Sequence, residues 1–395
     1  MRAVAFRASL LFILLLPFEN SVFIPVLGSL AKVAGLFLAA SWLLTVITEG
    51  RVRKPHLIHL IMLLFVLWVG LSVFWSIDPV GTVRRFFTYL QLVCVVFIIW
   101  DLYTTPTALR AGLQAYVFGA FIAALNTYYN YSQSNEFYFQ RYTAGDLQVN
   151  HLGIALALGI PIAWYLTLFK DKGWMGYWLR LVDYAYVPAA GLAISLVASR
   201  ASFLMSLGGF IFIFMSLVSS RTHVRILLFG ALLASFFALA PLVPEDSIGR
   251  SAGWLASPLM SARNTGRPEG RLQTWRAGLA ISSQRPVLGV GSGGFKEAND
   301  ETGHEPHNLV IALLAELGPI GLILFVSVLM LSVYHAMLQP KPTRGLWLTV
   351  LFGLAIALAT HNAEGQKQTW LLLGLVTVGA GLCIRSDESR HERSG

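Results

Sequence analysis

Long apolar runs recur along the whole sequence and are mostly separated by short polar gaps. A helix needs about 20 apolar residues to cross a bilayer, because each residue advances it by about 1.5 Å through a core of about 30 Å. Twelve runs qualify, although the first is short and interrupted by Pro17 and the tenth exceeds what a bilayer needs. The predicted spans are residues 7–24, 28–48, 56–75, 84–102, 109–130, 151–169, 182–199, 202–219, 223–242, 307–337, 345–361 and 368–384. The pattern therefore predicts an all-α polytopic membrane protein with about 12 transmembrane helices.

One polar segment, residues 243–306, is much longer than the other gaps and separates the ninth span from the tenth. We therefore expect three regions along the chain. They are residues 1–242 with helices 1–9, residues 243–306 as a large loop with short helices, and residues 307–395 with helices 10–12 and a tail.

The basic residues outside the large loop gather in alternate gaps. One set of gaps, which includes both chain ends, carries 16 Lys or Arg residues, whereas the other set carries 5. Cytoplasmic loops carry the positive excess, so we expect both termini in the cytoplasm and residues 243–306 outside it. The first apolar run follows Arg2 and Arg7 as in a signal peptide, but it lacks a small-residue cleavage site, so we expect a retained helix.

The composition agrees with lipid as the main solvent. Charged residues make up 12% of the chain, against about 25% in a soluble domain. The formal charge of +9 is explained by cytoplasmic loops, so we expect no nucleic-acid partner. Cys94 and Cys383 both fall within apolar runs, which excludes a disulfide framework and a thiolate metal site. The sequence also lacks a P-loop and an Asp-x-Asp pair for a metal-bound nucleotide sugar.

Four arginines lie in short gaps on the predicted outer side. Arg141 follows an aromatic run, and Arg200 lies in a tight turn between two spans. A charge so close to hydrocarbon is usually paired or functional, and the planar guanidinium suits phosphate oxygens. We therefore favour a functional role for Arg200. The alternative is an arginine that anchors a helix end at the interface, and we favour that role for Arg84 and Arg85.

The large loop contains a predicted helix at residues 270–280, in which Leu272, Trp275 and Leu279 share one face. Such a helix could lie on the membrane with its arginines, including Arg271, toward the headgroups, or it could be a purely structural lid. A glycine turn at residues 289–294 follows and matches G-x-G-x-x-G literally. No strand precedes it, so we reject a dinucleotide site and expect a tight turn whose amides could approach a phosphate.

His307 is the candidate general base. The segment from His304 to Asn308 is one residue short of the H-E-x-x-H zinc motif, and Pro306 would break the helix that this motif needs. Pro306 predicts the start of the tenth helix, which places His307 at a positive helix end that favours the neutral imidazole. The alternative is a hydrogen-bonded interfacial histidine. We favour the base, because the outer arginines fall on the same face.

Several sequence elements occur in an order that resembles the O-antigen ligase and polymerase superfamily of bacterial envelope proteins. The main one runs from His307-Asn308 to Gly321 and contains Glu316 in an E-x-G-x-x-G pattern. The others are Arg141 with Asn150, Ser199-Arg200, Arg271 with Trp275, and the turn of Pro286, Gly289 and Gly291. The resemblance extends from about residue 141 to residue 370.

This resemblance implies a membrane glycosyltransferase of the GT-C type, with its active site on the periplasmic face of the bacterial inner membrane. The donor would be a glycan on undecaprenyl diphosphate, and the acceptor in the ligase branch would be a sugar of the lipid A core. It implies no cofactor and no metal, because arginines can neutralise the leaving diphosphate. The implied site comprises His307 as the catalytic residue, Arg200, Arg271 and Arg141 at the diphosphate, and Asn308, Trp275 and Glu316 in support.

Three other functions stay open at this point. An O-antigen polymerase or a protein O-oligosaccharyltransferase would use the same donor and differ in the acceptor. A transporter or flippase would instead be expected to carry ionisable groups or broken helices in the middle of the membrane. The charges here gather at one face, with few within spans, which favours interfacial chemistry over transport.

Overall fold

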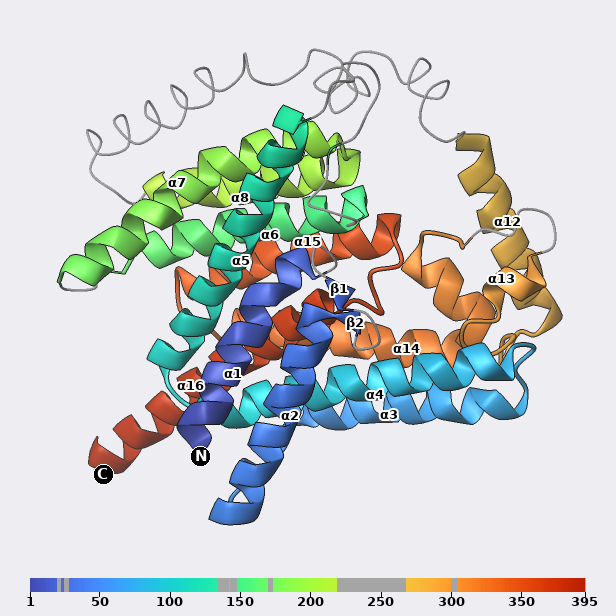
Figure 1. The fold of residues 1–395 in the computed structure, drawn as a ribbon. Helices are drawn as coiled ribbons and strands as arrows, with labels where there is room; N and C mark the ends of the chain where they lie inside the picture. The colour runs from blue at the N-terminus through green and yellow to red at the C-terminus, as the bar shows by residue number, and fades with distance from the viewer. Residues whose placement is uncertain are drawn as a thin grey trace. The chain divides into compact units, whose positions relative to one another are not determined.

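The structure is a computed structural model that describes residues 1–19, 23–24, 28–133, 142, 148–169, 173–218, 268–299 and 305–394. These residues form thirteen α-helices, two 3-10 helices and one antiparallel pair of two-residue strands (Figure 1). The strands are β1 (Phe23–Ile24) and β2 (Gly28–Ser29), and the 3-10 helices are η1 (Leu16–Phe18) and η2 (Ser72–Phe74). The α-helices are α1 (Arg2–Leu15), α2 (Leu30–Glu49), α3 (Leu57–Leu71), α4 (Pro79–Leu102), α5 (Pro106–Gln133), α6 (Val149–Thr167), α7 (Trp174–Val197), α8 (Arg200–Val218), α12 (Pro268–Gln284), α13 (Phe295–Ala298), α14 (Leu309–Met337), α15 (Thr343–Thr360) and α16 (Lys367–Ser394).

Ten helical segments are long and apolar enough to cross a membrane, counting only the part of the chain that the structure describes. This confirms the prediction of an all-α polytopic membrane protein. Most bounds agree with the predicted spans to within a few residues, although α7 begins at Trp174 rather than at residue 182. The predicted ninth span, residues 223–242, lies outside the described residues.

The first predicted span, residues 7–24, differs from the observed helix. α1 begins at Arg2 and ends at Leu15, and η1 follows it. Pro17 lies in η1 and has no N–H for an α-helical hydrogen bond, which explains why the α-helix stops there. The 14 residues of α1 rise only about 21 Å, less than the core of a bilayer.

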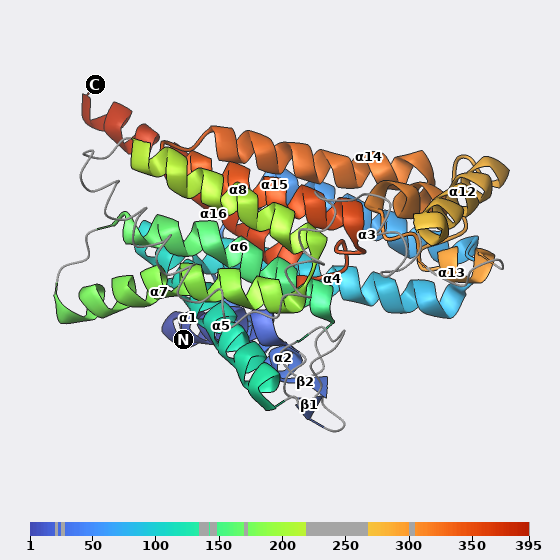
Figure 2. The same cartoon turned by 90° about the horizontal axis from the view of Figure 1, so that it is seen from above.

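The chain divides into two compact units, which are described separately. Unit 1 comprises residues 1–50, 102–258 and 339–353, and unit 2 comprises residues 51–101, 259–338 and 354–395. In unit 1, α6 packs against α5, α7 and α8, and every residue from Leu152 to Thr167 is buried (Figure 2). Glycines allow this close packing, since a Cβ on Gly153 or Gly159 would meet a side chain of a neighbouring helix.

In unit 2, α14 packs against α3, α12 and α16, and Figures 1 and 2 show α12 and α13 beside the N-terminal end of α14. α14 is broken at Gly318, whose φ of +65° is left-handed, and Pro319 follows without an N–H. At the break, three carbonyl groups of α14 accept hydrogen bonds from other segments. These bonds run from Val290 N to Ala315 O (2.9 Å), from Gly291 N to Glu316 O (2.9 Å) and from Trp68 Nε1 to Leu317 O (3.0 Å).

Candidate functional site

His307 lies immediately before the first turn of α14. The helix is capped by Asn308, whose Oδ1 accepts hydrogen bonds from the backbone amides of Val310 (3.0 Å) and Ile311 (3.3 Å). The cap therefore corrects the expectation that Pro306 sets the helix start, because an Asn side chain can satisfy amides that lack helical partners. His307 has a φ of +47°, a conformation that few residues other than glycine adopt. Its ring centroid lies 6.4 Å from that of His361.

The loop helix α12 is joined to the segment that carries His307. Trp275 Nε1 donates a hydrogen bond of 2.9 Å to the backbone carbonyl of Pro306, the residue before His307. Arg271 is exposed and lies four residues before Trp275, so the two residues share one side of the helix. The structure thus places Arg271, Trp275 and His307 in unit 2, with Trp275 as the direct link between α12 and the start of α14.

The face of α12 that is buried in the protein is not the face that carries its leucines. Leu272 and Leu279 are exposed, whereas Thr274 and Ile281 are buried. Gly278 lets α12 approach α14, because a Cβ there would meet the Ile311 side chain. Beneath α12, a small hydrophobic core joins the loop helices to α14. Its buried members are Ile281, Val290, Phe295 and Ala315.

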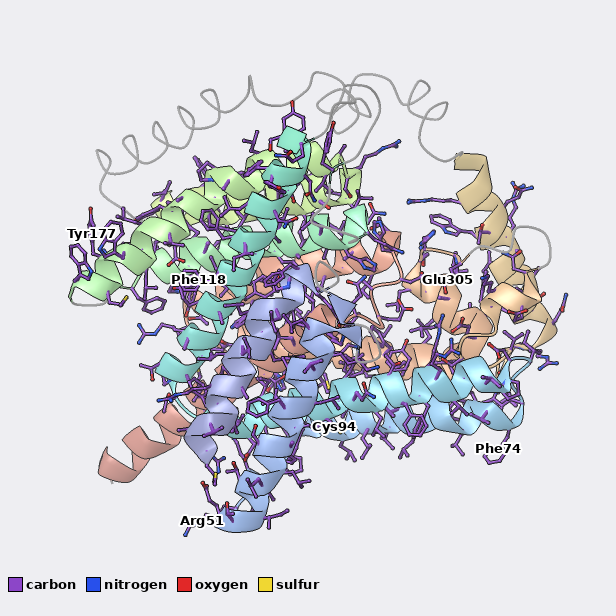
Figure 3. The ribbon with its side chains drawn as sticks, viewed as in Figure 1. Arg51, Phe74, Cys94, Phe118, Tyr177 and Glu305 are labelled. Carbon is purple, nitrogen blue, oxygen red and sulfur yellow. The ribbon has the colours of Figure 1, made fainter. Side chains whose placement is uncertain are left out.

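Arg85 is paired with two carboxylates and is not merely a helix-end anchor, which corrects the interpretation made from sequence. Its Nη1 lies 3.1 Å from Glu316 Oε2 on α14, and its Nη2 lies 3.2 Å from Glu305 Oε1. Figure 3 labels Glu305 on the segment before α14. The other Glu305 oxygen accepts a hydrogen bond from Asn362 Nδ2. One guanidinium therefore joins α4, α14 and the segment that leads to His307.

The connection between α15 and α16, residues 361–366, supplies further polar groups that sequence reasoning missed. Asn362 contacts Glu305, and the ring centroid of His361 lies 6.4 Å from that of His307. Glu364 is buried, and burial raises the pKa of its carboxyl group to about 7, partly opposed by the Arg85 charge. In the sequence, this connection is marked by the polar run H-N-A-E-G-Q between two apolar spans.

The glycine turn fastens α14 and does not offer its amides to a phosphate, which corrects the expectation from its sequence. Besides the two amides that bond to α14 carbonyls, Ser292 N donates to Ser72 Oγ (3.2 Å) and Gly294 N donates to Gly291 O (3.0 Å). Phe295 N donates to Glu316 Oε1 at 3.4 Å. Glu316 therefore supports the site by holding both Arg85 and the end of this turn.

Arg200 lies in unit 1, as the first residue of α8. The turn before it is as tight as the sequence predicted. Ala198 is left-handed with a φ of 51°, Ser199 is buried, and Arg200 itself is exposed. Tyr142 N donates a hydrogen bond of 3.3 Å to Leu196 O near the end of α7. Arg141, the neighbour of Tyr142, lies outside the described residues.

The predicted site residues thus fall into two groups, one in each unit. Unit 2 contains Arg271, Trp275, His307, Asn308 and Glu316, whereas Arg200 belongs to unit 1. Groups of three or more His, Cys, Asp or Glu side chains that could hold a metal ion do not occur among the described residues. Metal independence stays a prediction.

Comparison with known families identifies the class of protein. Residues 185–326 match the family described as O-antigen ligase, and this range includes Arg200, Arg271 and His307. A search of curated proteins found no match. The family match, together with the membrane helices, supports a membrane glycosyltransferase of the ligase or polymerase type. The match to residues 185–326 supports the resemblance predicted from the motifs.

Proposed function

We propose that this chain is an O-antigen ligase, which transfers a glycan from undecaprenyl diphosphate to the lipid A-core oligosaccharide. The reaction takes place on the periplasmic face of the inner membrane, and both termini lie in the cytoplasm. The family match and the apolar helices support this proposal, and the distribution of basic residues supports the orientation. The main structural observation behind the proposal is the well-defined backbone around His307. Trp275 of α12 donates a hydrogen bond to the Pro306 carbonyl, and Asn308 caps α14.

His307 acts on the acceptor in this proposal. Its neutral imidazole accepts the proton of an acceptor hydroxyl group, and the hydroxyl oxygen attacks the anomeric carbon of the donor glycan. The bond between that carbon and the diphosphate oxygen breaks, and the electron pair leaves with the diphosphate. Attack opposite the leaving group inverts the configuration at the anomeric carbon. The fixed backbone around His307 serves to keep the imidazole in place during this step.

The arginines act on the leaving group. Arg271 on α12 and Arg200 at the start of α8 are exposed, and they bind the lipid-borne diphosphate in this proposal, as does Arg141. Guanidinium groups bind phosphate oxygens through paired N–H donors and neutralise the charge that develops as the bond breaks. This accounts for catalysis without a metal ion. Arg85 has a different role, because its ion pairs with Glu305 and Glu316 connect α4 to α14 and to the segment before His307.

A reconstituted assay tests this function. The purified protein is supplied with an undecaprenyl-diphosphate-linked glycan and, in separate reactions, with lipid A-core, an acceptor peptide or additional donor. We expect transfer to lipid A-core, with unchanged yield when EDTA is present. Elongation of the donor alone would identify an O-antigen polymerase, and transfer to the peptide would identify a protein O-oligosaccharyltransferase. Loss of transfer with EDTA and its return with a divalent ion would contradict the arginine-based mechanism.

A further inference from the structure

Unit 1 contains a cavity that the proposed reaction does not use. It has a volume of about 440 Å³, and α1, α5, α6 and α7 line it. Its apolar wall includes Leu10, Leu14, Phe118, Leu166 and Leu179. Figure 3 labels Phe118 on α5, and Tyr177 near the start of α7.

The cavity lies far from Arg200 within the same unit. It is lined by residues near the beginning of α5, the end of α6 and the beginning of α7, such as Arg110, Phe169 and Arg180. Arg200 follows the opposite end of α7, about 20 residues or roughly 30 Å along the helix from Arg180. The charge distribution predicts that the cavity end is cytoplasmic. A ligand bound here is therefore not at the proposed reaction centre.

Two arginines that line the cavity both contact Phe169. The Arg110 guanidinium lies over the Phe169 ring, 4.8 Å from its centroid. Arg180 Nη2 donates a hydrogen bond of 2.7 Å to the Phe169 carbonyl just beyond the end of α6. An arginine has five N–H donors, so this one bond leaves Arg180 with donors for a ligand. Two guanidinium groups fixed around Phe169 produce a positive field that suits a phosphate group.

A buried acidic side chain lines the same cavity. Asp183 is only 2% exposed, and its Oδ1 accepts a hydrogen bond of 2.7 Å from Gln114 Nε2. Gln114 is neutral, and in the part of the chain that the structure describes, Asp183 forms no ion pair with a lysine or arginine. A buried carboxylate without a cationic partner is costly, so the cavity suits a ligand that brings a positive group to Asp183.

Exposed aromatic residues surround the start of α7 and indicate the depth of the cavity in the membrane. Trp174 is 74% exposed and Tyr177 is 59% exposed, and Trp178 beside them is also exposed. Trp and Tyr side chains concentrate at the membrane–water interface, where an apolar ring and a polar group are both accommodated. Arg180 lies less than two turns further along this helix. The polar groups of the cavity are therefore at headgroup depth.

We propose that this cavity binds one phospholipid whose headgroup carries both a phosphate and a primary ammonium, as in phosphatidylethanolamine. Arg110 and Arg180 bind the phosphate, Asp183 binds the ammonium, and the leucines with Phe118 cover the first part of the acyl chains. A volume of about 440 Å³ is within the usual range for a small-ligand site. A purely anionic headgroup would satisfy the arginines but would leave Asp183 without a cation.

Native mass spectrometry of the purified, delipidated full chain tests this proposal. Phosphatidylethanolamine and phosphatidylglycerol with identical acyl chains are titrated in parallel. We expect one phosphatidylethanolamine to bind about tenfold more tightly than phosphatidylglycerol, the difference typical of one charge-assisted hydrogen bond. Asp183→Asn should remove this preference, because asparagine can still accept the Gln114 bond but carries no charge. Equal binding of the two lipids by the unaltered protein would overturn the proposal, and so would a preference that survives in Asp183→Asn.

Two further variants and one control variant keep the test decisive if Asp183→Asn fails to fold. Arg180→Gln should weaken both lipids about tenfold, whereas Arg7→Gln should change neither, because Arg7 is an exposed arginine of α1 that does not line the cavity. Ala111→Trp should block the cavity, and added phosphatidylethanolamine should then no longer raise the Tm of the protein. Binding that is unaffected by both Arg180→Gln and Ala111→Trp would place the lipid elsewhere and contradict the proposal.

Discussion

Arg85 on α4 and Glu316 on α14 form an ion pair with 3.1 Å between Nη1 and Oε2, although 231 residues separate them in sequence. The Glu316 side chain is only 4% exposed, and its other oxygen accepts the Phe295 amide. Arg85 also reaches Glu305, two residues before His307. The pair therefore connects the position of His307 to the body of unit 2.

Removing Arg85 should destabilise the protein. Arg85→Ala leaves Glu316 as a buried charge without its partner, which typically costs about 3 kcal/mol. The neighbouring Arg84 is exposed, so Arg84→Ala should leave the Tm within about 1 °C. Thermal unfolding of the purified variants measures both. Arg85→Met combined with Glu316→Gln should cost less than the sum of the two single changes, and strict additivity would show that the two residues do not interact.

The break in α14 should require a glycine at position 318. A Cβ on Gly318 would meet the backbone carbonyl of Val287, and the φ of +65° disfavours any other residue. Gly50 is a matched control, because it has a similar φ of +62° but no atom within 4 Å of the position that a Cβ would occupy. Gly50→Ala should therefore cost only the conformational term of roughly 1 kcal/mol, and Gly318→Ala at least about twice as much. Equal changes in Tm would contradict the docking of the glycine turn on α14.

The buried Glu364 should make stability depend on pH. The folded-state pKa of about 7 exceeds the ordinary value of 4.5, so the folded chain binds this proton more tightly than the unfolded chain. The contribution to stability is complete below pH 4.5 and is lost as the pH rises through about 7. Glu364→Gln should accordingly raise the Tm by roughly several degrees at about pH 8 and change it little at about pH 5. The exposed Glu297→Gln is the control, and an equal effect of Glu364→Gln at both pH values would refute this account.

The sequence predicted the local elements well, because their signals are local. The apolar runs predicted the spans, and the tight turn before Arg200 and the helix around Trp275 are both present. The face of α12 that packs on α14 had no clear signal in the sequence, because it depends on how closely α14 approaches at Gly278.

The contacts of Arg85 and Asn362 could not be predicted from sequence for a different reason. Their partners, Glu316 and Glu305, are distant along the chain. In addition, an arginine near a helix end can either anchor the helix at the interface or form an ion pair, and the local sequence does not distinguish these roles. The tight glycine turn is present as predicted. The idea that its amides approach a phosphate was wrong, because only the fold shows that the break at Gly318 provides acceptors for them.

Two exposed arginines of α12 should differ in their effect on transfer. Arg271 shares the side of the helix that carries Trp275 and reaches the segment of His307, whereas Arg276 lies on another side. Arg271→Gln should lower glycan transfer by about 100-fold or more, the usual cost of losing one group that stabilises developing charge. Arg276→Gln should retain most of the activity. Equal losses in the reconstituted assay would point to a general effect of loop charge.

The role of His307 is the central claim, and the His307→Ala variant in the reconstituted ligation assay tests it most directly. The variant should have an unchanged Tm, because Asn308 still caps α14 and Trp275 still bonds to the Pro306 carbonyl. With an undecaprenyl-diphosphate-linked glycan and lipid A-core as substrates, its rate of transfer should fall by at least about 100-fold, as expected for loss of a general base. A folded His307→Ala variant that transfers the glycan at the rate of the unaltered protein would contradict the account.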